Sequence, residues 1–189
     1  YTHEWDGSLW GSEQTIAPAG LNGRDHLGFS VSMSGDKLAL GARNDDTIAT
    51  DAGAVYTYTW SGTAWTNEQK ITTLSALTLD QYGEVVTMSG DKMVISSSDD
   101  DGAGTDRGTV YLYEWDGSLW GNELELTPAG LADGDFFGFS TALSSDKLVV
   151  GAYGDTLLAG AIYSYKITPA PTTSPSFSPS TSPTTSPSA

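Results

Sequence analysis

One sequence unit recurs along this chain with a period of 55 residues. Trp5, Trp60 and Trp115 are spaced by this period, and so are three further sets of residues: Trp10, Trp65 and Trp120; Asp25, Asp80 and Asp135; and Gly28, Gly83 and Gly138. A fixed period of this length is typical of repeat architectures, in which each unit buries its apolar faces by stacking on its neighbours. The period therefore predicts a scaffold of stacked units, and that scaffold explains most of the residues that recur.

Charge and composition exclude several classes of partner. The 189 residues include 8 basic and 24 acidic side chains, which give a net charge of −16. This charge repels phosphate backbones and anionic lipid surfaces, so we expect neither nucleic-acid binding nor membrane insertion. The chain contains no cysteine, which excludes disulfides and thiolate metal sites. No apolar run approaches the roughly 18 residues of a membrane span.

Within one repeat the apolar residues alternate with a period of two. Residues 31–34 follow this pattern, Gly35 and Asp36 supply a turn, and residues 38–42 begin a second short strand. Residues 55–60 place aromatic and β-branched side chains on opposite faces, and residues 68–71 are a candidate fourth strand. A propeller blade lying between two other blades has four such strands. We therefore predict an all-β fold of about three propeller-type blades over residues 1–166.

The first and third repeats also carry a family signature. Residues 28–31 read Gly-Phe-Ser-Val, residues 41–42 read Gly-Ala, and residues 53–56 read Gly-Ala-Val-Tyr. This series resembles the FG-GAP repeat of integrin alpha-chain propellers and of many secreted repeat proteins. The middle repeat departs from it, because Tyr82-Gly83-Glu84 replaces the Phe-Gly-Phe stretch and Ser96-Ser97 replaces Gly-Ala. The resemblance implies a β-propeller with a role in binding or adhesion, and it implies no catalytic residue.

Acidic residues gather in one loop of the repeat. The resemblance implies a calcium loop between the first two strands, but residues 34–37 offer a single carboxylate beside a lysine, too few for six to eight oxygen ligands. The next loop is richer in carboxylates, and calcium bound weakly there is the candidate cofactor. A solvated, turn-rich loop is the alternative, since turns also favour Asp and Gly. The candidate ligands are Asp99, Asp101 and Asp106 in the second repeat, and Asp45, Asp46 and Asp51 in the first.

Two other recurring sets have structural explanations. Asp25, Asp80 and Asp135 each precede the Gly of the Phe-Gly-like motif by three residues, where a side-chain hydrogen bond to the backbone is a simpler role than metal binding. The tryptophans could stack on sugar rings, but a residue required in every blade is more often part of the packing. We interpret Trp5, Trp60, Trp115, Gly28, Gly83 and Gly138 as structural residues of the repeat.

Signals of catalysis are weak in this sequence. The two histidines, His3 and His26, stand at non-equivalent positions of the repeat. No Gly-x-Ser-x-Gly elbow and no Gly-rich phosphate loop before a helix is present. Two carboxylates at glycosidase separation would be invisible in a sequence, so a secreted hydrolase stays as a third hypothesis.

Residues 167–189 differ in composition from the repeats. Ser-Pro recurs every four residues, at Pro175, Pro179, Pro183 and Pro187, and the segment after Lys166 carries no charged side chain. Such a segment favours extended polyproline-II conformations and resembles the O-glycosylated stalks of secreted and cell-wall proteins, although a bare linker has the same composition. The candidate O-glycosylation sites are Ser174, Ser178, Ser182 and Ser186.

These features together predict a non-catalytic extracellular scaffold for adhesion, matrix or surface-filament assembly. The competing hypothesis is a lectin-like or peptide-binding propeller module that acts alone. Expected partners are other copies of the chain or neighbouring repeats of a longer chain, and a cell-surface or matrix protein or glycan.

The phase of the repeats suggests self-association. The chain opens at Tyr1, inside a repeat, as a mature fragment or an excised piece would. Two complete blades are expected at about residues 29–71 and 84–126, and the next blade lacks a fourth strand at Lys166. Propellers typically close with four to eight blades. We therefore expect a part of a longer propeller, or a subunit whose amino-terminal strands complete the last blade of a neighbour.

Overall fold

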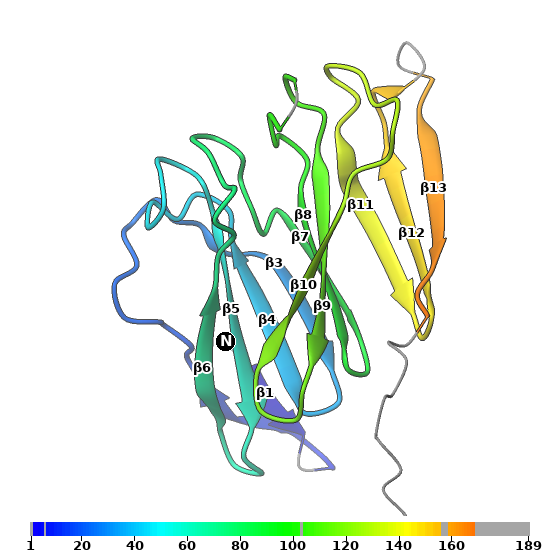
Figure 1. The fold of residues 1–189 in the computed structure, drawn as a ribbon. Helices are drawn as coiled ribbons and strands as arrows, with labels where there is room; N and C mark the ends of the chain where they lie inside the picture. Colours follow the sequence, from blue (N-terminus) through cyan, green and yellow to red (C-terminus); the bar gives the residue numbers. More distant parts are fainter. Residues whose placement is uncertain (1, 6, 103, 156–158, 169–189) are drawn as a thin grey trace, which may run out of the picture.

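The computed structural model describes residues 2–5, 7–102, 104–155 and 159–168 (Figure 1). Short β-strands in four antiparallel sheets make up its regular secondary structure, as the period-two pattern predicted. The first sheet is a hairpin of β1 (Thr2–Trp5) and β2 (Trp10–Gln14). Blade 1 consists of β3 (Leu27–Ser34), β4 (Lys37–Ala42), β5 (Ala54–Trp60) and β6 (Trp65–Ile71).

The other two blades repeat this order. Blade 2 consists of β7 (Val85–Ser89), β8 (Lys92–Ser97), β9 (Thr109–Trp115) and β10 (Trp120–Leu126). Blade 3 consists of β11 (Phe137–Ser144), β12 (Lys147–Ala152) and β13 (Ala161–Lys166). In each blade the strands pair in chain order, so the predicted propeller-type blades are confirmed. The hairpin β1–β2 corresponds by the period to the third and fourth strands of a blade.

Each blade begins with the same tight hairpin. In blade 1 the chain turns at Gly35, whose φ of +60° a glycine adopts without steric cost. The carbonyl of Asp36 in this turn accepts the N–H of Trp60 at 2.8 Å, and Asp91 and Asp146 accept the N–H groups of Trp115 and Ile167 in the same way. This bond ties the first turn of a blade to the end of its third strand in all three repeats. Ile167 is buried in blade 3, so the packed chain continues past Lys166.

The apolar cores lie between successive blades. Val55 of blade 1 packs with Val86 and Met88 of blade 2 in one buried cluster, and Val110 of blade 2 packs with Phe137 and Val150 of blade 3 in another. β3 lies along β7, and β7 lies along β11. Blade 2, which lies between the other two, therefore buries both of its faces, and this explains why its strands are apolar on both sides.

Polar side chains fix the register between blades. The hydroxyls of Ser32 and Ser34 on β3 accept the N–H groups of Met88 and Gly90 in blade 2 at 3.0 and 2.9 Å. The side-chain amide of Gln69 on β6 accepts the N–H of Trp120 at 2.9 Å and donates to its carbonyl at 2.8 Å. Gln14 on β2 holds Trp65 in the same way. A glutamine in the fourth strand thus anchors the fourth strand of the next blade.

Candidate functional site

The acidic loops join the second strand of each blade to the third. Since the strands of a blade alternate in direction, these loops lie at the same end of all three sheets (Figure 1). In blade 1 the loop contains Asp45, Asp46 and Asp51, and in blade 2 it contains Asp99, Asp101 and Asp106. This end of the molecule is therefore the place to examine the predicted cation site.

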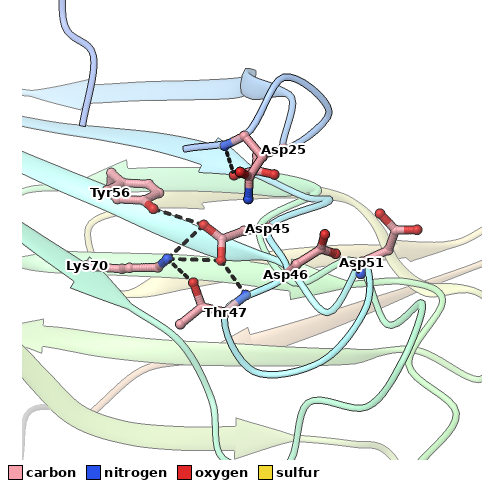
Figure 2. Close-up of polar contacts among 8 residues, drawn as sticks. Asp25, Asp45, Asp46, Thr47, Asp51, Tyr56 and Lys70 are labelled. Atoms are coloured by element: carbon pink, nitrogen blue, oxygen red, sulfur yellow. Dashed lines mark hydrogen bonds and ion pairs between the residues drawn. The ribbon is translucent and has the colours of Figure 1, made fainter. Parts of the chain in front are cut away.

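Asp45 is buried at the base of its loop and is fully engaged (Figure 2). Its carboxylate accepts hydrogen bonds from Lys70 Nζ at 2.7 and 2.9 Å, from the Tyr56 hydroxyl at 2.9 Å and from the Thr47 N–H at 2.9 Å. Burial raises the pKa of Asp45, but the bonds from Lys70, Thr47 and Tyr56 outweigh it, and the pKa lies below its ordinary value. Asp45 is a structural ion-pair partner of Lys70.

The equivalent carboxylate of blade 2 has no lysine. Asp100 accepts the Tyr111 hydroxyl at 3.0 Å and the Gly102 N–H at 2.8 Å, but Glu125 stands at the position of Lys70. Burial, followed by the charge of Asp80, raises the pKa of Asp100. The same fold position thus holds a compensated carboxylate in blade 1 and an uncompensated one in blade 2.

Sequence reasoning missed the tyrosine–aspartate bond that underlies this motif. It recurs in blade 3, where the Tyr163 hydroxyl donates to Asp155 at 2.6 Å. The signal was present in the sequence, because Tyr56 and Tyr111 are spaced by the same period as Asp45 and Asp100.

The predicted calcium ligands mainly close their own loops. Asp46 accepts the N–H of Asp51 at 2.8 Å, and Asp101 accepts the N–H of Asp106 at 3.1 Å. Asp51 and Asp106 both have positive φ, 52° and 50°, a conformation that aspartate tolerates better than most residues. These roles give the loop carboxylates a structural reason to recur.

Two further contacts engage the side chains of Asp51 and Asp99. Asn44 donates to the Asp51 side chain at 2.8 Å, and Gln81 donates to Asp99 at 2.5 Å. Among the described residues, which omit Ala103 in this loop, no group of three acidic or histidine side chains is arranged to hold a metal ion. The calcium site at Asp99, Asp101 and Asp106 stays a prediction that solution measurements must test.

Calcium should stabilise the protein if this site binds it. Extracellular sites can have dissociation constants of about 0.1 to 1 mM, so 10 mM calcium should raise the free energy of unfolding by about 1.4 kcal/mol or more. Isothermal calorimetry and a thermal melt in the same buffer measure this, with the Asp101→Asn variant as the control that should lose the response. An unchanged melting temperature with no heat of binding would remove calcium as a cofactor.

The other recurring aspartates have the expected backbone role. Asp25 accepts the N–H of Asn22 at 2.7 Å, and Asp135 accepts the N–H of Ala132 at 2.6 Å. Asp80 accepts the N–H of Leu77 in the same way. These bonds shape the turn that leads into the first strand of each blade. One oxygen of the buried Asp25 has no hydrogen-bond partner among the described residues.

The recurring glycines fit the close approach of two blades. Gly28, Gly83 and Gly138 have φ values of 85°, 90° and 100°. A Cβ on Gly83 would lie 2.7 Å from the Ala54 carbonyl oxygen, and one on Gly138 would lie 3.0 Å from Val110 Cγ2. The inner glycines are therefore required both by their backbone conformation and by the neighbouring blade.

The tryptophans pair across the hairpin that joins the third and fourth strands. The ring centroids of Trp60 and Trp65 lie 5.3 Å apart, and those of Trp115 and Trp120 lie 5.4 Å apart. These aromatic contacts account for their recurrence as a packing feature. The Trp5 side chain and the tail serines Ser174, Ser178, Ser182 and Ser186 lie outside the described residues.

Comparison with known proteins agrees with the repeat pattern. The family model described as FG-GAP repeat matches three consecutive segments, residues 10–58, 65–113 and 120–165. No curated protein sequence matches the chain. No helix in the described ranges has the length and apolar character needed to cross a membrane. Three matched segments cover most of the chain, and each runs from a fourth strand, β2, β6 or β10, to the third strand of the next blade, so the protein belongs to the FG-GAP repeat family.

Proposed function

We propose that this chain is a non-catalytic extracellular scaffold that serves adhesion, matrix or surface-filament assembly. The observation that supports this best is the use of its recurring polar side chains. Asp45 pairs with Lys70, and Gln14 and Gln69 hold the neighbouring blades. Such a molecule uses its polar groups to order repeats, and its surfaces remain available for partners.

The family membership supports the same role. FG-GAP repeats form propeller-like modules that are generally non-enzymatic and are typical of extracellular proteins. The net charge of −16 disfavours association with nucleic acid. A Ser/Thr/Pro-rich segment after the blades suits a stalk that holds a binding module away from a surface. The proposed partners are further repeats of this kind and a cell-surface or matrix protein or glycan.

Antibody labelling of intact cells that produce the protein tests the location. Labelling of the surface or the surrounding matrix is the expected result, with permeabilised cells as the control for total protein. Labelling that needs permeabilisation would contradict an extracellular scaffold. A glycan array probed with the purified chain tests the competing role, since specific binding by a monomer would favour a lectin-like module.

A further inference from the structure

The first blade carries an exposed copy of an inner interface. Val86 and Met88 on β7 are 5% and 7% exposed because blade 1 covers them. Val31 and Met33 occupy the same positions on β3, and they are 63% and 64% exposed. The same apolar pair is thus buried inside the array and open to solvent at its beginning.

The last blade carries the matching exposed face. Val55 and Val110 are fully buried against the following blade, whereas Ile162, which replaces them in blade 3, is 80% exposed. The hydrogen bonds between successive blades form a matching series, in which a serine at the end of the first strand accepts a backbone N–H of the next blade. Ser34 accepts the N–H of Gly90, and Ser89 accepts the N–H of Ser145 at 3.0 Å. Ser144 is the third member of this series, and the amide it would accept is that of Gly35 in another copy.

An open sheet edge adjoins this last face. β13 pairs with β12 alone among the described strands and is the outermost strand of the array, whereas β5 and β9 each have a fourth strand beside them (Figure 1). A groove of about 440 Å³ runs along β13 and is lined by the apolar side chains of Leu112, Leu124, Leu126, Tyr165 and Ile167. An unpaired edge beside an apolar groove is a template for another strand.

The sequence after β13 lacks the turn that supplies this strand in the other blades. That turn contains Gly62 in blade 1 and Gly117 in blade 2, with φ values of 97° and 104°. Pro169 stands at the equivalent position, and its ring restricts φ to about −65°. This turn is therefore not copied after β13, and among the described residues blade 3 has no fourth strand.

We propose that a second copy of this chain supplies it, by packing its blade 1 on the outer face of blade 3 and pairing its β2 with β13. β2 is a fourth strand by the period, and its Gln14 holds it to blade 1 of its own copy independently of β1. β1 and the β13 of the other copy would both pair with the same edge of β2, because each is a third strand by the period. The six-residue β13 therefore displaces the four-residue β1, whose pairing with β2 has an irregular register.

The pairing between copies follows from the two complete blades. Thr59 lies opposite Thr66, and Glu114 lies opposite Gly121. By the period, Lys166 of one copy lies opposite Gly11 of the other. Lys166 and Gly11 are both exposed, and a side chain added at Gly11 meets no atom within 4 Å. This inference deepens the scaffold proposal and rests on it, since it names the chain itself as an assembly partner.

Cysteine cross-linking of the full chain tests the pairing, because the natural sequence contains no cysteine. Mixing Lys166→Cys with Gly11→Cys chains under mild oxidation should give a disulfide-linked species of about twice 19.9 kDa. The yield of this species should be several-fold higher than the yield from a control mixture of Lys166→Cys with Ser118→Cys chains. Ser118 lies on an exposed hairpin that is not part of the proposed pairing. Equal yields from the two mixtures would overturn the proposal.

A locked hairpin gives a second, independent measurement. Glu4 lies opposite Gly11 within one copy, so a Glu4→Cys, Gly11→Cys chain can tie β1 to β2 by a disulfide. Light scattering at micromolar concentration should show assembly of the wild-type chain, monomers of the oxidised variant, and assembly again after reduction. A monomeric wild-type chain would overturn strand exchange, and so would assembly of the oxidised variant to the same extent as the wild type. Surface labelling would still decide the scaffold role, so the two failures are distinguishable.

Discussion

Replacing Gly53 by alanine should lower the free energy of unfolding by about 2–5 kcal/mol. Gly53 has a φ of 89°, and a Cβ there would lie 2.8 Å from the carbonyl carbon of Tyr82 and closer still to its oxygen. A left-handed conformation costs a non-glycine residue about 1–2 kcal/mol, and overpacking adds about 1–3 kcal/mol. Chemical denaturation followed by tryptophan fluorescence measures the loss. Gly108→Ala should behave alike, because its Cβ would meet Phe137.

Gly160 provides the matched control for this prediction. It occupies the same position in blade 3 with a φ of 77°, but its nearest potential contact is the Tyr153 carbonyl oxygen at 3.5 Å. Gly160→Ala should therefore cost only the conformational penalty of about 1–2 kcal/mol when it is measured at a concentration where the chain is monomeric. Equal losses for Gly53→Ala and Gly160→Ala would show that the close approach of the blades contributes nothing.

The Asp45→Asn and Asp100→Asn variants should differ at neutral pH although their positions are equivalent. Asp45→Asn leaves the Lys70 ammonium without its carboxylate and should cost about 1.5–3 kcal/mol, a fall in melting temperature of about 3–12 °C. Asp100→Asn should change stability by less than about 1 kcal/mol. It removes a buried charge near Asp80, and the Tyr111 hydroxyl can bond with Ser75, which lies 3.2 Å away.

The pH dependence of stability should separate these two carboxylates further. The pKa of Asp45 is lowered in the folded state, so its contribution is present above its ordinary pKa of about 3.9 and is lost as the pH falls through the folded value. The pKa of Asp100 is raised, so its ionised form costs stability at neutral pH, and acidification towards 3.9 relieves that cost. Thermal melts between neutral pH and the acid range should show the penalty of Asp45→Asn shrinking with acid. A constant penalty would exclude the ion pair as its cause.

The fold was largely predictable because the period and the alternation are local features of the sequence. Strands at residues 31–34, 38–42 and 55–60 lie within β3, β4 and β5. The turn at Gly35 was predictable for the same reason, since it depends on the conformational freedom of one residue. Fold class and family therefore follow from patterns that a single repeat contains and that the next one copies.

The contacts that give individual residues their roles were not predictable in this way. Lys70 lies 25 positions from Asp45, and the other repeats do not copy it, since Glu125 replaces it in blade 2. Gln14 and Gln69 did recur with the period, but their bonds to the backbone of the next blade require knowing which blade edges face each other.

The blades, their order and the positions where glycine, aspartate and tryptophan recur follow from the amino-acid sequence alone, because backbone geometry and side-chain alternation act over a few residues. The differences between equivalent positions become visible in the folded protein. Val86 is buried, whereas Val31 is exposed to solvent. The Asp45 carboxylate forms an ion pair with Lys70, whereas the pKa of Asp100 is raised by burial and by the charge of Asp80. The reason is physical: burial and charge compensation depend on the neighbouring blade, and at the two ends of the array the repeat is the same while the neighbour is not.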